Sequence, residues 1–374
     1  MKFLIITHSI HKHKLGQVYA YEPYVREMNL WGKHVNEIII IAPVSVDKVT
    51  SIEVPYCHNK IRVVEIPNFD ITSFKNVLKS ILVIPEICWL IYKEMKQVNH
   101  VHLRCPGNIG LLGTLVQILF PSKAKTAKYA GNWDPNSKQP ISYRLQKWIL
   151  SNTFLTKRCK VLVYGEWENQ SKNIFPFFTA SYKKEEIIEV PKKCFSGVIK
   201  FIFVGTFSEG KQPMLSVKII QRLLSKNIEV QLNMYGEGAK FNEVKRYVVE
   251  NKLENNIFLH GNKPKEIVKK AFIEAHFLIF ISKSEGWPKV VAEAMFWKCL
   301  PISTDVSCIA YMLDYGNRGT VVEPNVLIED LVEIVLNYIN NETIYQQQSF
   351  EAQKWSQNFT LDKFEFEIGK LINH

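Results

Sequence analysis

The sequence predicts an α/β protein with two domains, each built on a parallel sheet with helices on both faces. Its 374 residues exceed the roughly 250 to 300 at which a single hydrophobic core stops growing. Short continuous apolar runs alternate with longer segments of helical spacing, as expected when buried parallel strands alternate with helices. This alternation lapses over 171–196 and then restarts, which indicates a second domain of the same type.

The first domain is predicted over residues 1–170. Its first strand, 3–7, is followed by a segment of helical spacing, 21–33, that ends at a glycine. Its other predicted strands are 37–43, 62–67, 100–106, 127–131 and 160–165. Helical patterns lie between most of these strands, which is typical of a doubly wound, Rossmann-like domain. The polar stretch 171–196, interrupted by prolines, is predicted to be a linker.

The second Rossmann-like domain is predicted over 197–354. Its strands are expected at 199–205, 228–236, 256–261, 276–282 and 300–305. Its helices are expected at 213–226, 239–251 and 264–274, with another from Pro288. The tail 355–374 is predicted to form a last helix that packs back across the domain junction. Two such domains would leave a cleft lined by the loops that follow their strands, where open α/β sheets bind ligands.

Composition excludes several classes of protein. An apolar content of 47% and a charged content of 22% are typical of a globular protein. The opening MKFLII resembles a signal peptide for only six residues before the polar THSIHKHK, so it is interpreted as a buried strand. The longest apolar runs, 80–91 and 109–120, fall short of the ~18 to 20 residues of a spanning helix. An integral membrane protein is therefore not expected.

Cysteine and histidine patterns give no sign of a disulfide framework or a metal site. The seven cysteines are odd in number and include no C-x-x-C pair, which predicts free thiols in a reducing cytoplasm. No H-E-x-x-H motif or carboxylate cluster of metal spacing is present. No metal or other cofactor is expected.

Basic residues are concentrated in the first half of the chain. Residues 1–195 hold 27 Lys and Arg against 15 Asp and Glu, while 196–374 hold 20 against 21. This asymmetry fits nucleic acid, an anionic membrane surface, an anionic acceptor, or only a solvated lysine-rich face. No nucleic-acid motif accompanies the charge, so no nucleic-acid partner is expected. KAKTAK (123–128) and the apolar segment 109–120 are predicted to touch the inner face of a membrane.

Four consecutive loops after the strands of the second domain carry glycine together with charged residues. They are GTFSEGKQP (205–213), YGEGAK (235–240), HGNKPKE (260–266) and SEGWPKVVAEAM (284–295). Proline is favoured in the first turn of a helix, so Pro288 places Glu285 in a loop and Glu293 about two turns into a helix. Free backbone amides between the two carboxylates favour an anion. The loops predict a phosphate-bearing ligand rich in hydroxyls.

The combination of these loops resembles the donor-site signature of family 4 glycosyltransferases, which are retaining enzymes of the two-domain GT-B fold. The likeness rests on the E-x7-E spacing of Glu285 and Glu293 after a strand that ends in serine, on Lys211 six residues after Gly205, and on the GEG and HG turns. It is strong over 199–305 and looser before residue 130. In the first domain, HKLGQVYAYEP resembles the family's glycine loop near the donor phosphates.

The resemblance implies roles for these residues. Glu285 and Lys211 would be catalytic: Lys211 would neutralise the diphosphate, and Glu285 would hold hydroxyls of the transferred sugar. Glu293 would accept hydrogen bonds from the ribose, and amides from Gly286 to Val290 would bind sugar or phosphate oxygens. The full set of implied donor-binding residues is Gly16, Gly205, Thr206, Lys211, Gly236, Glu237, Gly261, Gly286, Trp287, Pro288, Lys289, Val290 and Glu293.

Two positions depart from the family's pattern. Thr206 stands where relatives usually carry an arginine, so Arg104 and Lys289 are candidates for the second phosphate cation. A first-domain histidine is also missing, and the stretch AGNWD suggests Asn132 or Asp134 for contacts to the sugar. His102 and Arg104 lie in a segment that resembles one facing sugar and acceptor, although a histidine on an apolar strand is more often part of the core.

The resemblance implies a metal-independent hexosyl transfer from a nucleotide-diphosphate sugar to a glycan or lipid-linked acceptor, in surface polysaccharide or lipid-linked glycan assembly. Two alternatives stay open. A non-catalytic nucleotide-sugar-binding partner is supported by Thr206 and the missing histidine. A sugar-nucleotide 2-epimerase of the same fold would need carboxylates and histidines placed for proton abstraction, and no clear set is visible.

Overall fold

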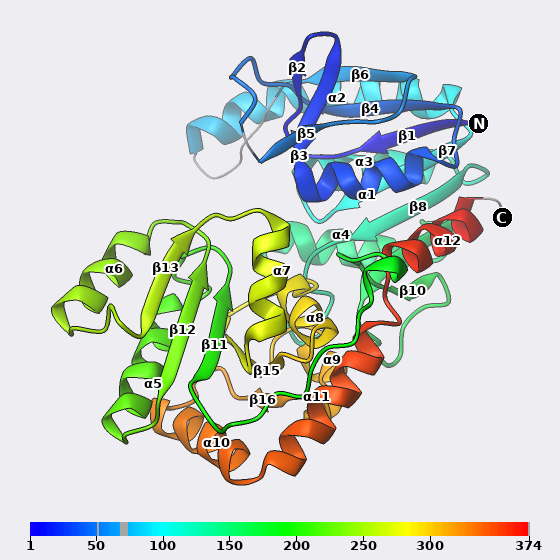
Figure 1. Ribbon diagram of the computed structural model, residues 1–374. Coiled ribbons are helices and arrows are strands. Elements are labelled where there is room, and N and C mark those ends of the chain that lie inside the picture. Colours follow the sequence, from blue (N-terminus) through cyan, green and yellow to red (C-terminus); the bar gives the residue numbers. More distant parts are fainter. Residues whose placement is uncertain (51, 68–73, 373–374) are drawn as a thin grey trace. The chain divides into compact units, whose positions relative to one another are not determined.

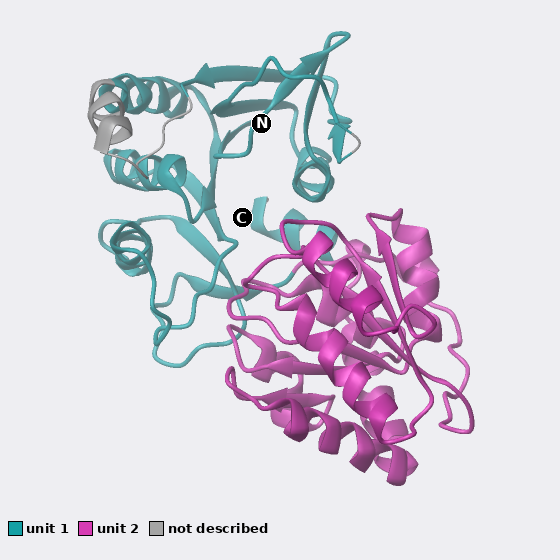
Figure 2. Ribbon diagram, turned by 90° about the vertical axis from the view of Figure 1, so that its left-hand side faces the viewer, with its two compact units in different colours: residues 1–178, 364–374 teal, residues 179–363 magenta. Residues whose placement is uncertain are grey.

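The computed structural model describes residues 1–50, 52–67 and 74–372, and it divides into two compact units. Unit 1 comprises Met1–Phe178 and Phe364–His374, and unit 2 comprises Thr179–Lys363 (Figure 2). Each unit is an α/β layer structure, as the sequence predicts. The division at Phe178 falls inside the stretch expected to be a linker, and the chain re-enters unit 1 at Phe364.

Unit 1 is built on a seven-stranded sheet of order β10-β9-β8-β7-β1-β4-β6, in which all neighbouring strands are parallel (Figure 1). The strands are β1 (Lys2–Ile6), β4 (Glu37–Pro43), β6 (Ile61–Ile66), β7 (His100–Cys105), β8 (Ala124–Tyr129), β9 (Cys159–Tyr164) and β10 (Ile174–Phe177). Strand β10 lies within the expected linker. It is an edge strand, where Pro176 is tolerated because one side of the strand needs no partner.

Unit 1 also contains a three-stranded antiparallel sheet where a loop was expected. It consists of β2 (Lys12–Lys14), β3 (Gln17–Tyr21) and β5 (Glu53–Pro55). Strands β2 and β3 are joined by Leu15 and Gly16, with φ of 50° and 76°. Positive φ at both positions is the geometry of a tight hairpin turn, which glycine adopts without strain.

Helices cover both faces of the large sheet in unit 1. Phe3 stacks on Trp31 of α1 (Glu22–Gly32) with ring centroids 5.7 Å apart. Leu4 and Ile6 face the other way, into a core shared with α2 (Phe74–Gln97) and α3 (Asn108–Val116). The remaining helices are the short η1 (Gln117–Leu119), α4 (Ile141–Ser151) and most of α12 (Leu361–Ile372). Alternating residues of β1 thus serve two helix layers, as a doubly wound sheet requires.

The segment KAKTAK (123–128) is not the basic surface that the sequence suggested. Residues 124–128 of this segment lie in β8, a central strand, in which Lys125 is 2% and Lys128 0% exposed. Both ammonium groups donate to backbone carbonyls, Lys125 to Phe120 at 2.6 Å and Lys128 to Phe178 at 3.1 Å. A lysine stem can cross apolar surroundings when its ammonium group finds acceptors at the far end.

The apolar segment 109–120 is likewise largely internal. Its residues Ile109, Leu112 and Val116 are buried in the core of unit 1. Leu115 and Leu119 are exposed. Burial of Lys125, Lys128 and the core residues of 109–120 contradicts a membrane contact through those side chains, while contact through the exposed residues of the two segments stays a prediction.

Unit 2 is built on a six-stranded parallel sheet of order β13-β12-β11-β14-β15-β16. Its strands are β11 (Ile199–Val204), β12 (Val230–Tyr235), β13 (Ile257–Gly261), β14 (Phe277–Phe280), β15 (Leu300–Thr304) and β16 (Thr320–Val322). Its helices are η2 (Lys184–Glu186), α5 (Pro213–Ser225), α6 (Phe241–Glu250), α7 (Lys265–Glu274), α8 (Lys289–Phe296), α9 (Ile309–Met312), η3 (Asp314–Gly316), α10 (Ile328–Asn340) and α11 (Glu342–Ser356). The single tail helix predicted from residue 355 is in fact the end of α11 followed by α12.

Each large sheet has one point where the strand order changes direction. In unit 1 the chain builds β1, β4 and β6 outward and then returns to place β7 on the other side of β1. In unit 2 it builds β11, β12 and β13 and then places β14 beside β11. Loops diverge at such a switch point, which leaves a crevice outside the carboxyl ends of the two strands. In the described part of the chain, no helix combines the length and the apolar character needed to cross a bilayer.

Candidate active site

The switch point of unit 2 brings together two residues that the sequence separates by 74 positions. Lys211, in the loop after β11, forms an ion pair with Glu285, in the loop after β14. The ammonium also lies over the ring of Phe280, 4.7 Å from its centroid. The amide of Lys283 donates to the carbonyl of Gly210 at 2.8 Å, so the two loops are bound to each other through the backbone as well.

Backbone hydrogen bonds also connect the loops after β11, β12 and β13. The amide of Phe207 donates to the carbonyl of Glu237 at 2.9 Å, and that of Gly236 donates to Gly261 at 2.9 Å. At Gly236, φ is 125°, and a Cβ there would overlap the carbonyl oxygen of Gly205. The glycines of the predicted donor loops therefore permit close backbone approach, and through it they set the position of the loop that carries Lys211.

The two carboxylates of the E-x7-E element occupy the places that the sequence predicts. Glu285 lies in the loop and is 9% exposed at its side chain, while Glu293 lies in the second turn of α8. Helix α8 begins at Lys289, so Pro288 is its cap residue and not a member of its first turn. Glu293 accepts a hydrogen bond from the hydroxyl of Ser181. Each carboxylate thus has a different partner within unit 2.

The loop between the carboxylates is held rigidly from behind. The carbonyl of Gly286 accepts hydrogen bonds from the hydroxyl of Ser307 at 2.8 Å and the thiol of Cys308 at 3.4 Å. Trp287 is 8% exposed and stacks on Trp355 with ring centroids 6.4 Å apart. Trp287 therefore packs into the body of unit 2 and fixes the path of the loop, and its contact with a donor stays a prediction.

Thr206 occupies the position at which relatives usually carry an arginine, and Lys289 is one of the two candidates for the second phosphate cation. Thr206 is exposed, and its carbonyl accepts the amide of Ser208 at 2.8 Å in a tight turn. Lys289 is the first residue of α8 and lines a small hollow together with Glu293. Of the two cations considered for the missing arginine, Lys289 is the one in unit 2, beside the loop that carries Glu285.

Arg104 is committed to a buried ion cluster in unit 1. Its guanidinium donates to Glu27 at 2.6 Å, and Lys128 approaches the same carboxylate at 3.4 Å. Burial alone would lower the pKa of Arg104, but the carboxylate of Glu27 raises it above its usual value. With 12% of its side chain exposed, Arg104 is held by the fold and is not a free phosphate cation.

His102 does not reach a ligand site. It is fully buried in β7, where Nδ1 lies 2.8 Å from the hydroxyl of Thr126 and the ring packs on Trp31 at 4.4 Å. Desolvation, with a further contribution from Arg104, lowers the pKa of His102 well below its usual value. The prediction that His102 contacts the sugar or the acceptor is wrong, because its side chain points into the helix layer under α1.

Asn132 and Asp134 shape the loop after β8. The side-chain carbonyl of Asn132 accepts the amide of Asp134 at 2.9 Å, and the carboxylate of Asp134 accepts the amide of Asn136 at 2.8 Å. Both are local turns in which a side chain replaces a backbone acceptor. Their sugar contacts stay a prediction, and so does the phosphate contact of Gly16 at the tip of the β2–β3 hairpin.

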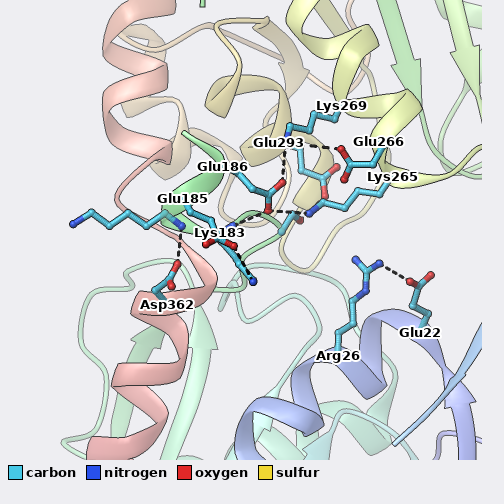
Figure 3. Close-up of polar contacts among 12 residues, drawn as sticks. Glu22, Arg26, Lys183, Glu185, Glu186, Lys265, Glu266, Lys269, Glu293 and Asp362 are labelled. Carbon is cyan, nitrogen blue, oxygen red and sulfur yellow. Dashed lines mark hydrogen bonds and ion pairs between the residues drawn. The ribbon is translucent and has the colours of Figure 1, made fainter. Parts of the chain in front are cut away.

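Sequence reasoning missed residues that contact the predicted ones. Ser181 comes from the segment that opens unit 2, and this segment is anchored by Glu186, which binds Lys265 at 3.3 Å and Lys269 at 2.9 Å on α7 (Figure 3). Partial burial alone would raise the pKa of Glu186, but its contacts with Lys269 and Lys265 lower it. The acidic and basic residues of 183–186 had been visible in the sequence, but nothing there showed which helix they would face.

This geometry can bind an anion and a polyol together. An ammonium group at the mouth of a crevice stabilises a diphosphate, and adjacent carboxylates accept directional hydrogen bonds from hydroxyls. Within the described residues, no group of three or more His, Cys, Asp or Glu side chains is placed to hold a metal ion.

Comparison of the fold with known structures defines its class. The chain is similar to the crystal structure of Anabaena HepE in complex with UDP and glucose, with a TM-score of 0.69 and 11% identity. The similarity covers 100% of this chain and 99% of that one. At this level of identity it shows the fold alone, which is the two-domain GT-B fold.

Sequence comparison finds relatives of the second unit. Residues 184–355 match the family model of glycosyl transferases group 1. An uncharacterised glycosyltransferase of Methanocaldococcus jannaschii is 28% identical over 170 residues, covering 46% of each chain. The poly(glycerol-phosphate) alpha-glucosyltransferase of Bacillus subtilis is 25% identical over 199 residues, covering 50% of this chain and 27% of that protein. The matches thus span less than half the length of these relatives.

Proposed function

We propose that the protein is a retaining glycosyltransferase that moves a hexose from a nucleotide-diphosphate sugar to a hydroxyl group of an acceptor. The observation that carries this proposal is the meeting of Lys211 and Glu285 at the switch point of unit 2. The sequence predicts that the Lys211 loop and the Glu285 loop bind one ligand, and the fold brings the two side chains into contact. The family match over 184–355 supports the same reaction class.

In the proposed reaction, the bond between the anomeric carbon and the diphosphate oxygen breaks, and a bond to the acceptor oxygen forms on the same face. The acceptor proton leaves with the diphosphate. Charge grows on the diphosphate as the bond breaks, so Lys211 and the amino end of α8 stabilise the transition state more than the bound donor. Glu285 would hold the sugar hydroxyls and Glu293 the ribose, and no metal is assigned a role.

For the acceptor, we propose a surface polysaccharide, a polyol-phosphate polymer or a lipid-linked glycan. The relative from Bacillus subtilis is named for poly(glycerol-phosphate), and a lipopolysaccharide 1,6-galactosyltransferase of Salmonella typhimurium is 27% identical over 150 residues, covering 39% of this chain and 41% of that protein. The basic first half of the chain suits an acceptor of this charge. We place the reaction in the cytoplasm, where the seven unpaired thiols would stay reduced.

The test is a thermal-shift screen against UDP, GDP, ADP, CMP and TDP in the presence of EDTA, followed by transfer assays with the matching sugar donors. We expect one diphosphate to raise the melting temperature of the wild type, and Glu293→Ala to lose that shift. Product analysis by proton NMR would then show the anomeric configuration. Binding without transfer or hydrolysis would favour a non-catalytic partner, which the exposed Thr206 would suit. No binding to any of the five would refute the donor site.

A further inference from the structure

Unit 1 contains a hollow of its own, at the opposite end of its sheet from the loops considered so far. It has a volume of about 570 Å³ and lies at the amino ends of β7, β8 and β9, which begin at His100, Ala124 and Cys159. These strands are parallel, and six residues long, so the hollow is separated from their carboxyl ends by five steps of about 3.3 Å, or roughly 16 Å. It is therefore distinct from any site at the carboxyl edge.

The lining of this hollow carries positive charge only. Five of its residues are cationic and none is an aspartate or glutamate; the cationic ones are Lys125, Lys157, Arg158, Lys160 and Lys172. Like charges gathered in a concave surface raise the local potential and attract anions. A volume of this size is in the range of pockets that hold small molecules, roughly 300 to 1,000 Å³.

Two of the cations are fixed by the protein and form a rigid wall. Lys125 donates to the carbonyl of Phe120 at 2.6 Å, and Arg158 donates to the carbonyl of Ser122 at 2.8 Å. Burial lowers the pKa of Lys125 to about 8. The Arg158 contact holds the loop before β8 against the start of β9, and the Lys125 contact holds the same loop against β8. Together they give the hollow a defined shape before any ligand arrives.

Lys160 and Lys172 are differently placed. Over the described residues, neither makes a hydrogen bond or an ion pair, although both line the hollow. Lys160 is half-buried in β9, and Lys172 lies in the exposed loop before β10. Two ammonium groups that line one hollow and have no carboxylate partner are available to an incoming anion.

A buried polar atom at the same wall points independently to a ligand. His100 is 2% exposed, and its Nε2 lies 3.0 Å from the hydroxyl of Thr126. Its other ring nitrogen, Nδ1, has no hydrogen-bond partner in the described structure. A buried polar atom without a partner costs on the order of 1 to 3 kcal/mol, and an oxygen of a ligand in the hollow would supply the partner.

We propose that this hollow is an anion site that binds a phosphate-type group, with Lys160 and Lys172 as its direct cations and His100 as a hydrogen-bonding partner. A phosphate or diphosphate offers several acceptor oxygens and a charge that matches two or more lysines. This chemistry has two sources, a free phosphorylated compound and the headgroup of an anionic phospholipid. The site stands independently of the donor site, because its residues all belong to unit 1.

The first arm of the test uses inorganic pyrophosphate and isothermal titration calorimetry on the full chain. Pyrophosphate would also occupy the proposed donor site, so the titration is done in the Lys211→Met variant. We expect binding to remain in Lys211→Met and to weaken at least tenfold when Lys160→Gln and Lys172→Gln are added. The matched control adds Lys93→Gln and Lys138→Gln, two exposed lysines of unit 1 that do not line the hollow, and should leave binding within twofold.

The second arm uses flotation with vesicles of phosphatidylcholine, with and without phosphatidylglycerol. Vesicle binding that needs phosphatidylglycerol and is lost with Lys160→Gln and Lys172→Gln identifies a lipid headgroup as the source. Pyrophosphate binding without vesicle binding identifies a free phosphate compound. The proposal is overturned if Lys211→Met binds neither probe, or if the lysine substitutions change neither binding. Lys172→Gln alone, in an exposed loop, serves as the second variant should the double substitution unfold.

Discussion

Both units have cations paired with a carboxylate near the carboxyl ends of their strands, but water reaches the two groups to different extents. In unit 2, the side chains of Lys211 and Glu285 are 25% and 9% exposed. In unit 1, those of Arg104, Glu27 and Lys128 are 12%, 7% and 0% exposed. Arg104 and Lys128 lie one residue before the ends of β7 and β8, so the cluster is close to the same edge of its sheet.

This difference in exposure indicates that the Lys211–Glu285 pair can bind a ligand, whereas the Arg104–Glu27–Lys128 cluster stabilises the fold. A lysine whose side chain is a quarter exposed can exchange its carboxylate partner for an incoming diphosphate at smaller cost, because water reaches the pair and screens it. A buried cluster cannot, since losing one member leaves an uncompensated charge in a dry interior. Lys128 also contacts the chain where it leaves unit 1, at Phe177, and where it returns, at Phe364, with its ammonium 5.2 and 4.8 Å from the two ring centroids.

The largest effect is expected from breaking the unit 2 pair. Glu285→Gln and Lys211→Met should each reduce glycosyl transfer by at least about 100-fold, as removal of a charge-stabilising group does in other enzymes. Stability should change by less than about 1 kcal/mol, because the pair is partly solvated. Release of nucleoside diphosphate and thermal melting measure the two quantities. Lys283→Met is the control, because this lysine is in the same loop and pairs only loosely, at 3.5 Å, with the exposed Glu209. Full activity in either pair variant would remove both residues from the mechanism.

Breaking the unit 1 cluster should affect stability first. Glu27→Gln leaves Arg104 and Lys128 without their shared carboxylate and should lower the free energy of unfolding by roughly 3 to 5 kcal/mol. Urea denaturation followed by circular dichroism gives the value. Glu22→Gln on the same helix is the matched control, since its pair with Arg26 is exposed (Figure 3) and worth less than about 1 kcal/mol. Equal effects of the two substitutions would contradict the distinction between the groups.

A third prediction concerns acid stability in unit 2. The Nδ1 of His276 accepts the amide of Lys200 at 3.0 Å, and Nε2 lies 3.1 Å from the carbonyl of Cys194, to which it donates. This arrangement needs the neutral ring, and burial, aided by Lys193, lowers the pKa of His276 to about 4. Between the unfolded value of about 6.5 and 4, the unfolded chain binds a proton that the folded chain does not, so stability falls as the pH falls.

The pH effect can be isolated by substitution. From pH 7 to pH 4, we expect the wild type to lose roughly 3 kcal/mol more stability than His276→Gln, measured by urea denaturation at each pH. His11 and His100 also have pKa values of about 4. They reduce the stability of both proteins at low pH by the same amount, so their contributions cancel in the difference. Parallel curves for the two proteins would show that His276 does not titrate as described.

The parts of the molecule that could be predicted from sequence are those set by local pattern. Strand after strand of β-branched and aromatic residues ends in a glycine-containing loop, and parallel strands place such loops at one edge, so Lys211 and Glu285 could be expected near each other. The hairpin of β2 and β3 was missed because its turn is Leu15-Gly16, which lacks the Asn-Gly or Asp-Gly signal.

Other features depend on contacts far apart in the sequence. KAKTAK appears basic in composition, but Lys128 is buried because Phe178, Tyr164 and Phe364 surround its ammonium group. Those partners are 36 to 236 residues away, and no local periodicity brings them together. Ser181 is a similar case, since only the fold shows that it lies against Glu293, 112 positions later.

The smallest predicted effect tests this contact between Ser181 and Glu293. The hydroxyl of Ser181 occupies a carboxylate that the proposed donor needs for its ribose, so the ribose hydroxyls must compete with it. Ser181→Ala should therefore tighten binding of the nucleoside diphosphate by about 0.5 to 1 kcal/mol, or two- to fivefold, as measured by calorimetry. Ser225→Ala, which removes only a local hydrogen bond at the end of α5, should leave the affinity unchanged. A weaker affinity in Ser181→Ala would contradict this prediction. It would mean that the hydroxyl of Ser181 holds the Glu293 carboxylate in the orientation that the ribose needs, and that the ribose does not displace the hydroxyl.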